Sequence, residues 1–308
     1  MRKILSLICT LLFASATYAQ GLAGIDYNTI PSDALISLAT QGVVDAQYYL
    51  ACRYDLGEGG LTQDAEKAAF WYLQAALKGD IYAQNAIGVC YLNGTGVKQD
   101  NEKAIEWMLE AAENGNVEAI FNLAVCLDEG KGVKKDPAGA IYLYSQAAEQ
   151  KYAPAQYNLG IHHEYGIGTA VNPKVAAQWY TLAANQGYLP AQNNLGQCYF
   201  NGVGVDKNPE MAVLWYSLAA ENGNAEAQVN LGYCYETGTG TDQNFENAAY
   251  WYKQAADQGD ASAQYNLGLL YYDGLGVEKD DALAKDYISK AASQGDENAQ
   301  KSLKTLFP

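Results

Sequence analysis

Residues 191–223 read AQNNLGQCYFNGVGVDKNPEMAVLWYSLAAENG, and this stretch decides the fold. Its first part places apolar residues at spacings of four, seven and eight, which is the stripe of an amphipathic helix. A glycine-containing turn at residues 202–205 ends that helix. Asn208 can cap a second helix with Pro209 at its first position, and Gly223 supplies the left-handed residue after its end. The stretch therefore predicts two helices joined by a short turn.

The same pattern returns along nearly the whole chain. Its first alanine recurs once after 37 residues and six times after 36 residues, and an eighth copy starts at Ala299. The third copy departs most, with Lys151 in place of the final glycine and Leu143 in place of the tryptophan of the second helix. The seven full copies begin at Ala46, Ala83, Ala119, Ala155, Ala191, Ala227 and Ala263.

These copies resemble the Sel1-like repeat family, with A-x-x-x-L-G-x-x-Y-x-x-G-x-G-V followed by a second helix containing A-x-x-W-Y-x-x-A-A. The resemblance covers residues 46–298. It implies an all-α fold, a right-handed α-solenoid of tandem antiparallel helix pairs in which seven repeats of about 36 residues place each first helix on the concave side. In the second helix, the spacing predicts that tryptophan and the alanines share a buried face. The usual role of the family is protein interaction.

Half-units are expected at both ends, because a stack of repeats needs terminal units with one polar outer face. Residues 20–45 contain a segment that begins at Ser32, ends at Gly42 and matches part of a second helix. Residues 299–308 match a lone first helix. We therefore predict an N-terminal segment with a capping helix and a C-terminal capping helix.

The first 19 residues have the pattern of a secretory signal peptide. Arg2 and Lys3 precede a short apolar run, and small residues lead to a cleavage site after Ala19, with a second candidate site three residues earlier. The apolar run is shorter than the roughly 20 residues that a spanning helix needs. The pattern predicts a periplasmic or secreted protein without stable membrane insertion after cleavage.

The composition is strongly acidic, with 35 Asp and Glu against 19 Lys and Arg and a formal charge of −16. Binding to nucleic acid and to anionic membranes depends mostly on Lys and Arg, so the charge weighs against both partners. It favours a basic protein or peptide, because complementary charge speeds encounter.

Residues suited to catalysis or metal binding form no recognised motif. Four of the five cysteines after the signal peptide share one repeat position, and a helix spacing of about 8 to 10 Å would keep them beyond the 7 Å limit for a disulfide. Buried thiols are predicted, with redox sensing as the alternative. His162 and His163 are read as a packed pair or a pH-sensitive spot, since ligands one repeat apart cannot share a metal ion. The chain has no Ser-x-x-Lys, and we predict no enzyme, metal or cofactor.

An asparagine recurs at the fourth position of the first helix, as Asn122, Asn158, Asn194, Asn230 and Asn266. Asparagine is a poor helix former, so its recurrence indicates hydrogen bonding. One interpretation is that each amide ties neighbouring helices together. The other, by analogy with tetratricopeptide proteins, is that the amides hold the backbone of a bound peptide. Aromatic residues at the preceding position are candidate anchors for such a partner, namely Phe121, Tyr157 and Tyr265.

These features predict an exported, non-catalytic scaffold or adaptor that binds a protein or peptide in a concave groove. Two alternatives stay open. One is a cell-wall or carbohydrate-associated module with hydrolase activity of the β-lactamase kind, with which some cysteine-rich relatives are associated. The other is a secreted factor that contacts host proteins.

Overall fold

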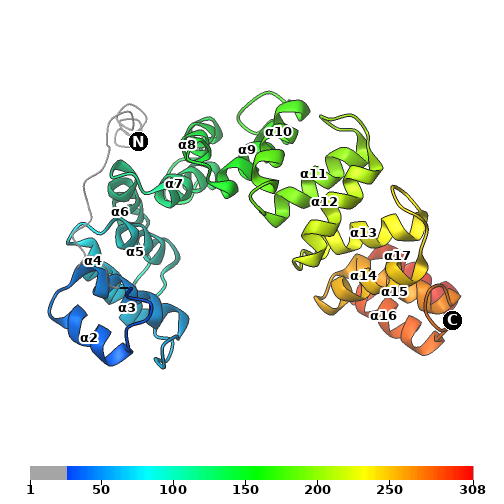
Figure 1. Ribbon diagram of the computed structural model, residues 1–308, viewed down its shortest axis with the longest axis horizontal. Coiled ribbons are helices and arrows are strands. Elements are labelled where there is room, and N and C mark those ends of the chain that lie inside the picture. The colour runs from blue at the N-terminus through cyan, green and yellow to red at the C-terminus, as the bar shows by residue number, and fades with distance from the viewer. Residues whose placement is uncertain (1–25, 308) are drawn as a thin grey trace. The chain divides into compact units, whose positions relative to one another are not determined.

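The computed structural model describes residues 26–307, and all regular secondary structure in that range is helical (Figure 1). The predicted signal peptide lies outside the described residues. The helices are α2 (Ser32–Thr40), α3 (Val44–Leu56), α4 (Ala65–Ala76), α5 (Ile81–Asn93), α6 (Asn101–Glu113), α7 (Val117–Glu129), α8 (Pro137–Glu149), α9 (Ala153–Tyr165), α10 (Pro173–Ala184), α11 (Leu189–Asn201), α12 (Pro209–Glu221), α13 (Ala225–Thr237), α14 (Phe245–Asp257), α15 (Ala261–Asp273), α16 (Asp281–Ser293) and α17 (Glu297–Leu306).

Odd-numbered helices from α3 to α15 are the first helices of the repeats, and even-numbered helices from α4 to α16 are the second helices. The described chain divides into two compact units, here called unit 1 (residues 26–155 with 167–169) and unit 2 (residues 156–166 with 170–307). Within each unit, a first helix packs on the second helix of its own repeat, and that second helix packs on the next first helix. The predicted all-α solenoid of helix pairs is confirmed.

The second helices begin where the Asp and Asn column predicts. Asn208 Oδ1 accepts a hydrogen bond from the backbone N–H of Met211 at 3.0 Å, and the other six second helices have the same kind of cap. After their ends the glycine column has positive φ, with Gly223 at +90°. Lys151 takes the same left-handed conformation, with φ of +62°, and is the one non-glycine residue in residues 26–307 to do so.

The tyrosine of the second helix forms the centre of most repeats. Tyr180 and Tyr252 are fully buried, and each ring lies against the glycine of the Leu-Gly pair in the first helix. A Cβ atom on Gly160 would lie 2.3 Å from the Tyr180 ring, and one on Gly232 would lie 2.7 Å from the Tyr252 ring. The glycine is therefore what lets the two helices of a repeat enclose a large side chain.

The tryptophans of the second helices are only half-buried, whereas the sequence predicted them on the buried alanine face. The adjacent tyrosine takes the inward position, and one residue corresponds to about 100° of rotation around the helix. Trp71 packs against a cluster formed by the N-terminal segment with α3 and against a cluster shared by the first two repeats, and Trp251 packs against a cluster that contains Leu231 of its own repeat and Tyr216 of the preceding repeat. The tyrosine thus fills the space between the two helices of one repeat, and the tryptophan packs that repeat against the preceding one.

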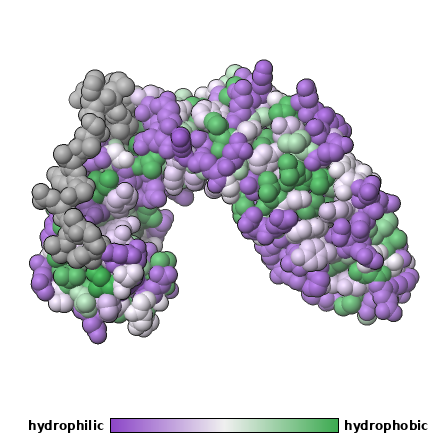
Figure 2. All heavy atoms as spheres, viewed as in Figure 1, coloured by the Kyte–Doolittle hydropathy of each residue, from purple (hydrophilic) through white to green (hydrophobic). Residues whose placement is uncertain are grey.

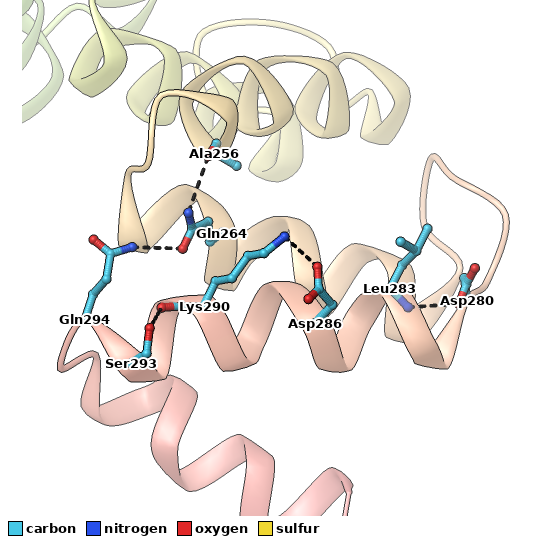
Figure 3. A network of polar contacts seen from close by, with 8 residues as sticks. All are labelled: Ala256, Gln264, Asp280, Leu283, Asp286, Lys290, Ser293 and Gln294. Atoms are coloured by element: carbon cyan, nitrogen blue, oxygen red, sulfur yellow. Dashed lines mark hydrogen bonds and ion pairs between the residues drawn. The ribbon is translucent and has the colours of Figure 1, made fainter.

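Buried glutamines of the first helices donate hydrogen bonds to backbone carbonyls at the end of the preceding second helix, and so link successive repeats (Figure 3). Gln264 Nε2 donates to the Ala256 carbonyl at the end of α14 at 3.4 Å, and its Oε1 accepts from Gln294 Nε2 at 2.9 Å. Gln228 and Gln258 make the equivalent pair one repeat earlier at 2.8 Å. These two junctions therefore each contain a short chain of side-chain and backbone hydrogen bonds.

Candidate binding face of the first helices

The asparagine column defines one side of each first helix, because residues three, four and seven positions apart project in similar directions. We call this side the first-helix face. In unit 1 it carries Tyr82 and Asn85 in α5 and Glu118, Phe121 and Asn122 in α7. In unit 2 it carries Tyr157, Asn158, Ile161 and Tyr165 in α9, Asn193, Asn194 and Gln197 in α11, Glu226, Asn230 and Tyr233 in α13, and Tyr265 and Asn266 in α15.

Two of the predicted asparagines join successive first helices. Asn122 Nδ2 donates to Asn85 Oδ1 at 2.9 Å, and Asn230 Nδ2 donates to Asn193 Oδ1 at the same distance. Asn193 is almost completely buried, and its own Nδ2 has no hydrogen-bond partner in the described chain. These amides therefore stabilise the stacking of neighbouring repeats.

The other three asparagines differ from each other in their surroundings. Burial raises the pKa values of Tyr157 and Tyr180, and hydrogen bonding with Asn194 opposes the rise for both phenols. Asn158 and Asn266 are half-buried and have no hydrogen-bond partner within residues 26–307. At the position 37 residues before Asn266, where Asn230 has Asn193 as its partner, the chain carries Val229, which offers no side-chain acceptor. Of the five recurring asparagines, only Asn158 and Asn266 therefore have side-chain amides available to bind another molecule.

The three predicted aromatic anchors are half-buried and packed into the fold. The Phe121 ring lies 5.3 Å from that of Tyr152, and the Tyr157 ring lies 5.4 Å from that of Tyr188. The Tyr265 hydroxyl lies 3.2 Å from Ser302 Oγ in α17. Each offers only part of its ring to a partner.

More exposed aromatic residues occur on the same face at positions that the repeat pattern does not fix. Tyr165 at the end of α9 is 65% exposed, Tyr82 at the start of α5 is 56% exposed, and Tyr233 in α13 is 48% exposed. These tyrosines were not predicted as binding residues, because they lie outside the recurring columns. What marks these tyrosines in the sequence is that they do not recur. Each is an aromatic residue at a position where the other repeats carry varied residues. The space-filling view shows apolar patches interspersed with hydrophilic ones over both units (Figure 2).

Several carboxylates of the first helices are bound to the buried tyrosines. The Tyr252 hydroxyl donates to Glu236 Oε2 at 2.6 Å, and the Tyr180 hydroxyl donates to Glu164. Burial, and then hydrogen bonding to the carboxylate, raises the pKa of each tyrosine. These carboxylates hold the second helix against the first and are only partly available to a ligand.

The first helices are poor in cations. The seven helices together contain nine acidic residues and a single Lys or Arg, which is Arg53. The Arg53 guanidinium donates to Ser32 Oγ at 2.9 Å and to the carbonyls of Asn28 and Ile30, so the N-terminal segment occupies it. The acidic residues are Asp45, Asp55, Glu118, Asp128, Glu129, Glu164, Glu226, Glu236 and Asp273. The first helices are therefore acidic, and their one cation is already bound to the N-terminal segment.

The cysteines and histidines lie inside the repeats. All five cysteines of the described chain are free thiols, and burial raises the pKa of Cys126, Cys198 and Cys234 to about 11. His162 is almost completely buried. His163 is half-buried, with its Nδ1 unpaired, and burial followed by the charge of His162 lowers its pKa. Residues 26–307 contain no group of three or more His, Cys, Asp or Glu placed to hold a metal ion. Nor does any helix in that range have the length and apolar character to cross a membrane.

Comparison with known families identifies the repeat. The Sel1 repeat model matches residues 44–80, 81–116, 117–152, 153–188, 189–224, 225–260 and 261–296. The chain belongs to the Sel1 repeat family. Sel1 repeats generally serve as protein-interaction scaffolds. No curated protein matches the sequence.

Two solved Sel1 structures are similar to this chain. One is c5321, a protective antigen present in uropathogenic Escherichia coli strains, with 37% identity and a TM-score of 0.74 over 89% of this chain. The match spans 59% of the E. coli chain, so the Sel1 chain described here corresponds to part of that protein's length. The other is a Sel1 repeat protein from Oxalobacter formigenes, with 30% identity, a TM-score of 0.72, and coverage of 98% of this chain and 86% of that one.

Proposed function

We propose that this Sel1 protein is an exported, non-catalytic scaffold that binds a protein or peptide on its first-helix face. The observation that carries the proposal is the chemistry of that face, which combines exposed aromatic rings, the amides of Asn158 and Asn266 without a hydrogen-bond partner in residues 26–307, and carboxylates on helices whose one cation is already bound. Aromatic rings can bury apolar side chains of a partner, and amides can pair with an extended backbone. The general role of Sel1 repeats supports the same conclusion.

The partner that this face fits is basic. Asp45, Glu118 and Glu226 occupy the same early position in three first helices, and Glu118 and Glu226 are exposed. A negative face attracts a positive segment and raises the rate of encounter, while aromatic contacts determine how long the complex lasts. We expect a Lys-rich or Arg-rich segment that lies across several first helices.

Export is part of the proposal and rests on the N-terminal sequence, with Arg2 and Lys3 before an apolar run and Ala19 at the favoured cleavage site. The mature protein would then work in the periplasm or outside the cell. N-terminal sequencing of the protein recovered from cell fractions tests this. A mature N-terminus at Gln20 in the periplasm or medium supports export, and an intact Met1 in the cytoplasm contradicts it.

Affinity capture from envelope extracts tests the binding face. The bait is the mature chain, compared with the double variant Asn158→Ala with Asn266→Ala, because these two side-chain amides have no hydrogen-bond partner within residues 26–307. The variant should fold as well as the parent and should capture less of the partner. Asn230→Ala is the matched control, because it breaks a bond between α11 and α13 and should lower stability instead. Equal capture by the parent and the folded double variant would place the binding surface elsewhere.

One observation favours a second candidate, a secreted factor that contacts host proteins. The similar E. coli protein is described as a protective antigen, and a protective antigen must be reached by the host's immune system. Capture from host extracts, run beside the envelope extracts, separates the two. Retention on peptidoglycan would instead support a role in cell-wall association.

A further inference from the structure

Glu226 is held at a fixed place on the first-helix face of unit 2. It lies in the first turn of α13 and is exposed, and its Oε1 accepts a hydrogen bond from Gln197 Nε2 of α11 at 2.9 Å. No cation among residues 26–307 pairs with Glu226, and its second oxygen has no partner there. The carboxylate is therefore oriented by the fold while most of its hydrogen-bonding capacity is unused.

Two aromatic rings lie on the same side of these helices. Tyr233 follows Glu226 by two helical turns, about 10 Å along α13, so both side chains project from one face. The Tyr233 ring lies 6.1 Å from that of Phe200 in α11, with their planes at 64°, and Tyr233 is 48% exposed. The arrangement combines an oriented carboxylate with a pair of aromatic rings about 10 Å away along the same side of α13.

The field of Glu226 reaches other helices of unit 2. The pKa of Tyr165 is raised first by Glu164 and by burial, and Glu226 contributes to the rise. Burial is the largest cause of the raised pKa of Tyr157, and Glu226 again contributes. Both tyrosines belong to α9, whereas Glu226 belongs to α13. Negative potential therefore extends from α13 to α9.

Elsewhere in the chain, tyrosine rings are covered by lysines of the protein itself. Lys67 lies over Tyr54 at 5.2 Å, and Lys279 lies over Tyr272 at 4.9 Å, both measured from Nζ to the ring centroid. No such lysine covers Tyr233, because α9, α11, α13 and α15 contain no Lys or Arg and none of the described cations pairs with this ring. The ring and the carboxylate are thus left for a cation from another molecule.

We propose that Glu226, Tyr233 and Phe200 form a subsite for one arginine or lysine side chain of the bound polypeptide. The cation pairs with the free oxygen of Glu226, and the aliphatic stem lies against the two rings. Arginine fits best, because its long aliphatic stem can lie along the rings while its planar guanidinium donates to the carboxylate. The subsite rests on the proposed function, because its occupant belongs to the polypeptide held on the first-helix face.

The test uses NMR titration of the ¹⁵N-labelled mature chain with the probe acetyl-Gly-Arg-Gly-amide. The uncharged comparison probe contains citrulline in place of arginine. The arginine probe should shift the side-chain amide of Gln197 and the backbone amides of Glu226 and Tyr233, and the citrulline probe should not. Glu226→Gln should weaken binding about fivefold. Glu246→Gln is the matched control, because Glu246 is exposed at the same place in the first turn of α14 and should leave binding unchanged.

Three outcomes would overturn the subsite: no shifts with the arginine probe, equal shifts with the citrulline probe, or equal weakening by Glu226→Gln and Glu246→Gln. The capture experiment with Asn158→Ala and Asn266→Ala is independent of these measurements. If that double variant loses its partner while Glu226→Gln has no effect on the probe, the binding face stands and the arginine subsite is wrong. If the probe binds as expected but the double variant keeps its partner, the subsite stands and the role of the asparagines is wrong.

Discussion

The glycine of the Leu-Gly pair shows how one absent side chain sets the spacing between the two helices of a repeat. A Cβ atom at Gly160 would lie 2.3 Å from the fully buried Tyr180 ring. Gly160→Ala gains about 1 kcal/mol of helix propensity, but overpacking a rigid core costs about 1 to 3 kcal/mol. We expect a net loss of roughly 1 kcal/mol in the free energy of unfolding, measured by urea denaturation.

The control for this change is the same substitution in a Tyr180→Ala background. Without the ring, the added methyl group has room, so Gly160→Ala should become neutral or stabilising. If the substitution costs the same in both backgrounds, contact with the ring does not explain the glycine.

A second residue-scale prediction concerns pH. Burial, and then the charge of His162, lowers the pKa of His163 in the folded protein below its ordinary value near 6.5. The unfolded chain then binds more protons than the folded one as the pH falls through that value. His163 therefore contributes stability that is fully present above about pH 6.5 and is lost as the pH drops toward the lower folded pKa.

Replacement by the tyrosine that most other repeats carry at this position isolates the effect. His163→Tyr should remove part of the loss of stability between about pH 7 and pH 5, seen as a smaller drop in the urea midpoint. Carboxylates titrate alike in both proteins, so the difference between the two profiles belongs to His163. Parallel profiles would contradict the prediction.

At the scale of elements, the junction between repeats depends on the length of one side chain. Gln258 and Gln294 reach the buried Oε1 atoms of Gln228 and Gln264. Asn222 holds the equivalent place but is one methylene shorter, and its Nδ2 donates to the Leu218 carbonyl at 2.8 Å instead. Gln192 Oε1 is left buried and without a hydrogen-bond partner in the described chain.

Asn222→Gln should supply the missing donor to Gln192 and raise the free energy of unfolding by about 1 kcal/mol. Gln258→Asn, the reverse change one repeat later, should lower it by a similar or larger amount, because it leaves the buried Gln228 Oε1 without a donor. Urea denaturation of both variants measures the two changes. Shifts of the same sign would show that the hydrogen bond between glutamines is not what distinguishes these junctions.

The elements could be predicted from sequence because each boundary has a local chemical cause. Asn208, Pro209 and Gly223 act within one turn of their own positions, and the structure places a helix start or end at each. The burial of tryptophan was predicted wrongly. Trp215 and Tyr216 are adjacent and both large, so periodicity alone does not decide which one faces inward. Packing against Gly196, where a Cβ would lie 2.6 Å from the Tyr216 ring, decides it.

The candidate site was less predictable for a related reason. The recurrence of asparagine correctly indicated hydrogen bonding, but the partners of Asn122 and Asn230 lie 37 residues earlier in the chain and change from repeat to repeat. Exposed Tyr233 and the bond between Gln197 and Glu226 lie at positions that the repeat does not fix. They depend on the stacking of neighbouring first helices, which a column of one residue type does not reveal.

At the scale of the whole molecule, the formal charge of −16 produces a long-range attraction for basic partners. Exposed charges are screened over about 10 Å at roughly 0.1 M salt, so association should slow as ionic strength rises. The first helices, whose one cation is Arg53 and is already bound, should direct this attraction more than the second helices do.

Two triple variants with the same change in net charge test that asymmetry. One neutralises Asp45→Asn, Glu118→Gln and Glu226→Gln, which lie in the first turns of first helices. The other neutralises Glu102→Gln, Glu210→Gln and Glu246→Gln, which lie in the first turns of second helices. Stopped-flow association with the captured basic partner should slow severalfold more in the first variant, and its salt dependence should become shallower. Because both sets lose the same helix-terminus interactions, equal slowing would mean that total charge, and not the first-helix face, governs encounter.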